Sequence, residues 1–144
     1  MSVESESALD AAYGVLRHRE RSTTEVRDRL AAAGYLDEEC KNAIETLVRT
    51  GLLDDARFAE LRARSLAERG AGDGRIRHEL ESAGIPSEIA DTALGTLGPE
   101  ADRARSVVMR RGPGAKTARY LHGKGFSHEI VAAAIADSHE EELG

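Results

Sequence analysis

The chain of 144 residues contains no tryptophan and few other aromatics, since tyrosine and phenylalanine make up only 3% of it. Its single cysteine, Cys40, excludes an internal disulfide and lies on the apolar side of a helical pattern, which favours a buried core thiol. No apolar run approaches the roughly 20 residues of a membrane-spanning helix. The first residues lack the basic and apolar segments of a signal peptide. We therefore expect a cytoplasmic protein with small local cores and no membrane partner.

The sequence also lacks the spacings typical of metal and catalytic sites. Its five histidines form no His-x-x-x-His pair, and none of them has a cysteine partner at zinc-ligand spacing. Residues 110–117 resemble a phosphate-binding loop only in part, because Arg110 and Ala115 stand where that loop requires glycine. No serine, histidine and aspartate can be grouped into a nucleophilic site. We expect no catalytic residues, no metal and no cofactor.

The chain does contain a threefold repeat. A leucine, three residues, a glycine and an apolar residue occur at 30–35, 80–85 and 121–126, and the same pattern recurs at 47–52. A glycine just after a helix can adopt the left-handed conformation, and the apolar residue after it packs back on the last turn. We therefore expect left-handed helix ends at Gly34, Gly51, Gly84 and Gly125. Repetition at this spacing predicts a tandem array of helical units, without one enclosed catalytic pocket.

Helical periodicity predicts three helices in each unit and no strands. Ser22 and Glu25 form a capping box that begins the second helix. The first helix is expected over 8–20, with an apolar stripe of Leu9, Ala12, Tyr13 and Leu16. A longer helix is expected over 55–69, with Phe58 and Leu61 on one face and Ala59, Ala63 and Leu66 beside it.

The predicted fold is all-α: an elongated tandem array of three three-helix repeats. The repeats are expected at 8–51, 52–98 and 99–138, between disordered acidic tails at 1–7 and 139–144. A three-helix unit has little core of its own, so neighbouring units are expected to support each other.

Charge is unevenly distributed along the chain. The net charge is −6, but residues 100–125 contain seven basic residues and only two acidic ones. Local charge matters more to an anionic partner than the total does. With so few aromatics, contact with nucleic acid would be made mainly through phosphates. The candidate partner-binding residues are Arg110, Arg111, Lys116, Arg119 and Lys124 in the third unit, and Arg62, Arg69 and Arg75 in the second.

Four segments resemble the RecX family, regulators of the RecA recombinase. They are residues 19–25, 51–59, 76–85 and 121–126, and the most specific is the Leu-Asp-Asp-x-x-Phe-Ala string at 53–59. The resemblance covers nearly all of 8–137 and implies a tandem three-helix architecture. It further implies a monomeric, non-enzymatic protein that binds RecA on single-stranded DNA, lies along the groove of that filament, and restrains recombination and coprotease activity in DNA repair and the SOS response.

Two other functions remain open at this point. Three-helix units with short turns are also typical of helix-turn-helix transcriptional regulators, although those need a recognition helix rich in base-reading side chains. The third helices expected here, 37–49, 87–97 and 128–137, are acidic or alanine-rich instead. The second of these two functions is that of a helical adaptor protein with an unrelated partner.

Overall fold

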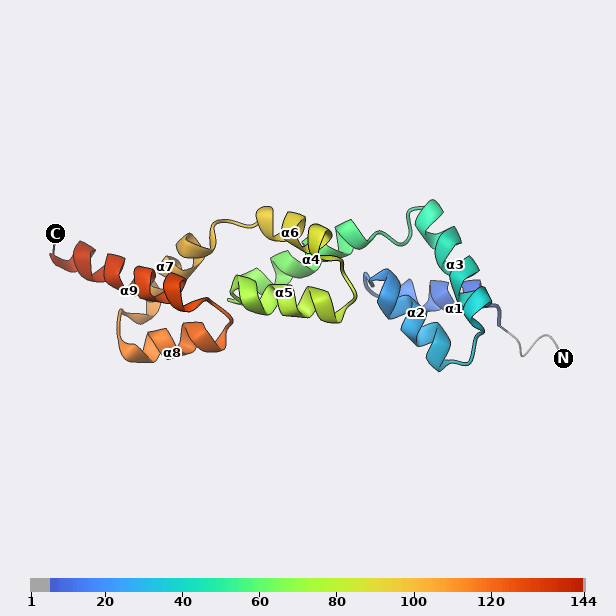
Figure 1. The fold of residues 1–144 in the computed structure, drawn as a ribbon, viewed down its shortest axis with the longest axis horizontal. Coiled ribbons are helices and arrows are strands. Elements are labelled where there is room, and N and C mark those ends of the chain that lie inside the picture. Colours follow the sequence, from blue (N-terminus) through green and yellow to red (C-terminus); the bar gives the residue numbers. More distant parts are fainter. Residues whose placement is uncertain (1–5, 144) are drawn as a thin grey trace.

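The computed structural model describes residues 6–143, and in that part of the chain it contains helices and no strands. Figure 1 shows an elongated molecule with the two chain ends at opposite ends of its long axis. The helices are α1 (Ala8–Leu16), α2 (Thr23–Ala32), α3 (Asp37–Arg49), α4 (Asp55–Glu68), α5 (Asp73–Ser82), α6 (Ser87–Gly95), α7 (Glu100–Arg111), α8 (Ala115–Gly123) and α9 (His128–Leu143).

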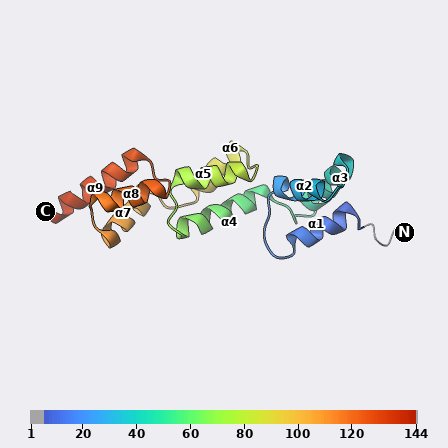
Figure 2. The ribbon, with the colours of Figure 1, turned by 90° about the horizontal axis from the view of Figure 1, so that it is seen from below.

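The helices pack in three groups of three, each around its own core (Figure 2). We call α1–α3 the first unit, α4–α6 the second unit and α7–α9 the third unit. Leu30 and Leu47 are among the buried residues of the first core, Ile76 and Leu80 of the second, and Leu121 of the third. The fold is thus the predicted all-α, elongated array of three-helix repeats.

The glycines predicted to end helices have the expected backbone. Gly34, Gly51, Gly84 and Gly125 have φ of 98°, 80°, 80° and 96°. After each of them, the amide of the apolar residue donates a hydrogen bond to the carbonyl of the leucine at the start of the motif, at 2.9 to 3.2 Å. This is the hydrogen bond of a Schellman helix end, so the prediction is confirmed.

The first and second units meet where the start of α2 contacts the end of α5, which we call the first junction. Ser22 caps α2 and also donates its hydroxyl to the carbonyl of Ala83, at 2.6 Å. The amide of Thr23 donates to a carboxylate oxygen of Asp55 on α4, at 2.8 Å. Ser22 is completely buried, so its hydroxyl is satisfied inside the protein.

The second and third units meet in the same way at what we call the second junction, where the start of α5 contacts the end of α8. The amide of Gly72 donates to the carbonyl of Lys124 at 2.8 Å, and the amide of Gly74 donates to the carbonyl of Gly125 at 3.1 Å. Arg103 on α7 adds an ion pair with Asp73. The second helices α2, α5 and α8 therefore follow one another end to end along the molecule.

Three details of the helices differ from the sequence predictions. α1 ends at Leu16, because residues 17–22 form the connection that brings Ser22 to the first junction. α9 continues to Leu143, where a disordered tail was expected from 139, because no glycine or proline interrupts 128–143. Tyr13 and Leu61 are both 42% exposed and are not core residues. Of the predicted N-terminal tail, residues 1–5 lie outside the described part.

Candidate interaction surface

Six of the eight candidate residues lie within four helices, and the other two are helix C-caps. Arg62 lies on α4 and Arg69 is the C-cap of that helix, while Arg75 lies on the first turn of α5. The remaining five come from the third unit: Arg110 and Arg111 end α7, Lys116 and Arg119 lie on α8, and Lys124 is the C-cap of α8.

The structure brings two of these residues together at the second junction. A Cβ added to Gly70, just after α4, would be 3.4 Å from Cε of Lys124 and 3.7 Å from the hydroxyl oxygen of Tyr120. The Arg75 guanidinium reaches the same place from α5, where it donates to the carbonyl of Gly123 at 3.0 Å. Arg75 and Lys124, from two units and far apart in the sequence, thus form a basic surface here.

Arg111 is connected to this surface through an aromatic ring. The central carbon of its guanidinium lies 3.5 Å from the centroid of the Tyr120 ring, which is a close cation–π contact between the end of α7 and the middle of α8. Gly112, with φ of 94°, turns the chain between those two helices. Tyr120 was not among the candidate residues, because the sequence does not show which side chains of α7 and α8 face each other.

The remaining candidates lie elsewhere on the molecule. Arg62 forms an ion pair with Glu79 of α5 at 3.5 Å and lines a shallow hollow beside the first junction, together with Arg69, Arg19 and Ser65. Arg110 donates to the carbonyl of Ser106 in its own helix, at 3.3 Å. Lys116 and Arg119 are exposed on α8.

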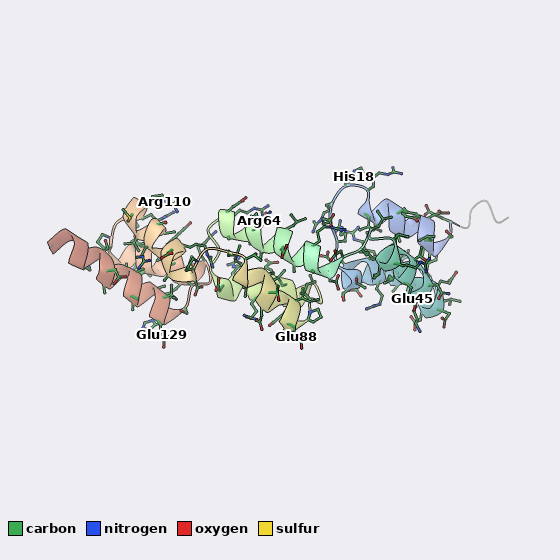
Figure 3. The ribbon with its side chains drawn as sticks, turned by 90° about the horizontal axis from the view of Figure 1, so that it is seen from above. His18, Glu45, Arg64, Glu88, Arg110 and Glu129 are labelled. Carbon is green, nitrogen blue, oxygen red and sulfur yellow. The ribbon has the colours of Figure 1, made fainter. Side chains whose placement is uncertain are left out.

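The six side chains labelled in Figure 3 lie along two opposite long edges of the molecule. His18, Arg64 and Arg110 lie along one edge, in or just after the first helix of each unit, and we call this the basic edge. Glu45, Glu88 and Glu129, from the third helices, lie along the opposite edge, which we call the acidic edge. An anionic partner is attracted to such arginines and repelled by such carboxylates.

An arginine that sequence reasoning did not select lies next to the first junction. Nε of Arg21 is buried and has no hydrogen-bond partner among the described residues. Burial lowers the pKa of Arg21 below its ordinary value, the charges of Arg19 and Arg29 lower it further, and Glu25 acts in the opposite direction. Only the packed structure reveals this residue, because its chemistry depends on burial.

The described residues do not form a metal-binding cluster. No group of three histidine, cysteine, aspartate or glutamate side chains among them could hold a metal ion. Burial raises the pKa of Glu100, but its carboxylate accepts a hydrogen bond from the amide of Asp73 at 2.7 Å and so has a structural role at the second junction. Within residues 6–143, no helix combines the length and the apolar character that crossing a membrane requires.

Comparison with known proteins identifies the family of this fold. Residues 8–47 match the family model of the first three-helix domain of RecX, and residues 54–94 match that of its second three-helix domain. A regulatory protein RecX from Chromohalobacter salexigens is 34% identical, over 97% of this chain and 98% of that protein. One from Halorhodospira halophila is 35% identical, over 96% and 92%.

Solved structures show the same architecture. A crystal structure of RecX from Lactobacillus salivarius superimposes with a TM-score of 0.80 and covers 96% of this chain and 99% of that one. Another crystal structure of a regulatory protein RecX gives a TM-score of 0.73. Both share 22% sequence identity with this chain, so they bear on the fold alone.

Proposed function

The chain belongs to the RecX family of regulatory proteins, and from that premise we propose that it binds the filament of the RecA recombinase on single-stranded DNA. In this proposal it restrains recombination and coprotease activity by occupying the filament, as a monomer in the cytoplasm and without catalysing a reaction. The bound partners are RecA itself and the DNA inside its filament.

Membership of this family and the basic side chains around the second junction support the proposal. Among the described residues, Arg69, Arg111, Lys116, Arg119 and Lys124 form no ion pair with a carboxylate, as is also true of Arg17 and Arg19 in the first unit. The first five extend from the end of α4 across the second junction to α8. An elongated ligand with free cations can contact several subunits or phosphates of a filament at once, and its contacts then add through effective concentration.

The alternative of a helix-turn-helix transcriptional regulator fits these features less well. A regulator of that class reads DNA with a recognition helix, which in a three-helix unit is the third helix. Here the third helices α3, α6 and α9 carry Glu45, Glu88 and Glu129 on the acidic edge. Phosphates would be repelled from that edge, so no second DNA-reading function is proposed.

Co-sedimentation with RecA filaments on single-stranded DNA tests the proposal. Wild-type protein is expected to sediment with the filament and to lower its DNA-dependent ATP hydrolysis in proportion to occupancy. Replacing Arg110, Arg111 and Lys116 by alanine should weaken binding while the fold stays intact, because exposed charges add little stability. The control variant replaces two exposed first-unit arginines, Arg17 and Arg19, and should lose less binding; Arg21 is left in place because its Nε is buried.

Two results would contradict this assignment in different ways. If saturating wild-type protein leaves ATP hydrolysis, strand exchange and filament length unchanged, the proposed function is wrong. If the first-unit variant loses binding while the third-unit variant keeps it, the function stands but the contact surface lies on another unit. A helical adaptor with an unrelated partner would give the first of these results.

A further inference from the structure

Arg111 and Tyr120 form a close cation–π contact at the end of α7. The guanidinium carbon lies 3.5 Å from the ring centroid, which is the spacing of two flat groups in van der Waals contact. Tyr120 is half-buried, whereas Arg111 is exposed. The ring therefore supports one face of the guanidinium, and the other face of that plane is turned away from the ring.

No group among the described residues neutralises this guanidinium. Arg111 forms no ion pair there, in contrast to Arg103 and Arg105, which are paired with Asp73 and with Asp102 and Asp137. Its only recorded side-chain partner is the Tyr120 ring. A cation held flat on an aromatic ring, without a competing carboxylate, remains available to an external planar group.

One further cation lies next to the same ring. The hydroxyl end of Tyr120 and Cε of Lys124 both approach Gly70. Lys124 forms no ion pair within the described part of the chain. One flat platform and one phosphate-binding cation thus lie within the reach of a single nucleotide segment at the second junction.

We propose that the outer face of the Arg111 guanidinium, held on the Tyr120 ring, stacks on a nucleobase of single-stranded nucleic acid while Lys124 binds a neighbouring phosphate. Guanidinium planes and aromatic rings are the surfaces on which proteins stack unpaired bases, and such stacking tolerates any base sequence. This inference rests on the proposed function, because it assigns the place where the DNA strand of the filament would be held. It also gives Tyr120 a role in positioning Arg111.

The proposal differs from a simple charge contact in a way that can be measured. A phosphate or a protein carboxylate needs only a positive charge at this place, which lysine also supplies. A stacked base needs the flat, delocalised plane of arginine, so Arg111→Lys keeps the charge and removes the platform. Tyr120→Leu keeps Arg111 but removes its support, whereas Tyr120→Phe keeps the ring and serves as the matched control.

The experiment compares binding of the full chain to two oligonucleotides of equal length, one of thymidines and one with abasic sites in place of the central bases. Fluorescence anisotropy at low salt should show that the wild type and Tyr120→Phe bind the thymidine oligonucleotide about fivefold or more tightly than the abasic one, the lower end of the effect of one stacked base. Arg111→Lys and Tyr120→Leu should bind both alike. Quenching of a 2-aminopurine base should be lost in the same two variants.

Equal binding of both oligonucleotides by the wild type, or binding of neither, would overturn the platform. Discrimination that survives in Arg111→Lys would overturn the role of the guanidinium plane. Filament co-sedimentation of the same proteins separates this result from the proposed function. If wild-type protein sediments with the filament but does not distinguish the oligonucleotides, only the platform is wrong, and if it fails to sediment, the proposed function is wrong as well.

Discussion

The glycines that end α2 and α5 share a left-handed backbone but differ in their surroundings. A Cβ at Gly34 would meet nothing within 4 Å, whereas a Cβ at Gly84 would overlap the side chain of Thr24 across the first junction. Gly34 therefore serves only to end its helix. Gly84 also allows the neighbouring unit to approach, and this second function depends on a contact between residues that are far apart in the sequence.

This difference predicts unequal costs for the same substitution. Gly34→Ala should lower the free energy of unfolding by about 1–2 kcal/mol, because alanine is strained in the left-handed conformation. Gly84→Ala should cost that amount and more, because its Cβ also displaces Thr24. Urea denaturation of both variants measures the difference.

The Thr24→Gly background provides the control, since there the overlap at Gly84 is absent. The extra cost of Gly84→Ala should then disappear, as a double-mutant cycle would show. Equal costs for Gly34→Ala and Gly84→Ala in the wild-type background would show that the first junction is not packed as described.

At the scale of the helices, the sequence predicted those starts and ends that carry a local signal, such as a capping box or a glycine, but not the ends of α1 and α9. The capping box of Ser22 and Glu25 and the left-handed glycines are formed by residues within a few positions of each other, and both are confirmed. The buried faces of α1 and α4 were harder to predict. Both helices contain several alanines, and the structure buries Ala12 and Ala63 completely while Tyr13 stays exposed.

The physical reason is the close packing of two helices within a unit. α1 packs against α3 and α4 packs against α6, and small residues let two helix backbones approach. Helical periodicity alone favours the burial of a large side chain such as Leu61 over that of a neighbouring alanine. In the structure Leu61 is 42% exposed, while Ala63 is buried where the helices pack. The choice between two adjacent faces therefore needs the three-dimensional packing.

The starts of α5 and α8 allow a test of the second junction. Gly72 and Gly114 are both N-caps with an extended backbone, so alanine is not strained by φ at either of them. A Cβ at Gly72 would lie 2.5 Å from the amide nitrogen of Phe126, whereas one at Gly114 would meet nothing within 4 Å. Gly72→Ala should therefore separate the hydrogen bonds of Gly72 and Gly74 to the end of α8 and loosen the two units.

We expect Gly72→Ala to cost about 1–2 kcal/mol more than Gly114→Ala, the value of two backbone hydrogen bonds. Circular dichroism should show equal helix content, while small-angle X-ray scattering should show a broader distribution of shapes for Gly72→Ala. An unchanged scattering profile together with equal stability would mean that the units are not held at this place.

At the scale of the whole molecule, the threefold repeat predicted the array but not the relative orientation of its units. That orientation depends on contacts such as Ser22 with Ala83 and Gly72 with Lys124, which join residues 61 and 52 positions apart. The separation of charge into a basic edge and an acidic edge depends on it too. Hence the sequence indicated which residues are basic, while the structure was needed to show that Arg75 and Lys124 meet.

The two edges make a last prediction possible. Replacing Glu45, Glu88 and Glu129 by glutamine removes three negative charges from the acidic edge, while Glu68→Gln removes one next to Arg69. The two edges lie on opposite sides of the molecule. Screening reaches about 8 Å at physiological salt, so the triple variant should bind RecA filaments within about twofold of the wild type there.

At low salt the screening length rises to about 30 Å at 0.01 M, and the triple variant should then bind more tightly than the wild type. Glu68→Gln should bind more tightly under both conditions, because Glu68 directly precedes Arg69, one of the proposed contact residues. Co-sedimentation at two salt concentrations measures both effects. If the triple variant instead loses filament binding at physiological salt, the acidic edge itself contacts the filament, and the basic residues of α4, α7 and α8 are not sufficient to account for binding.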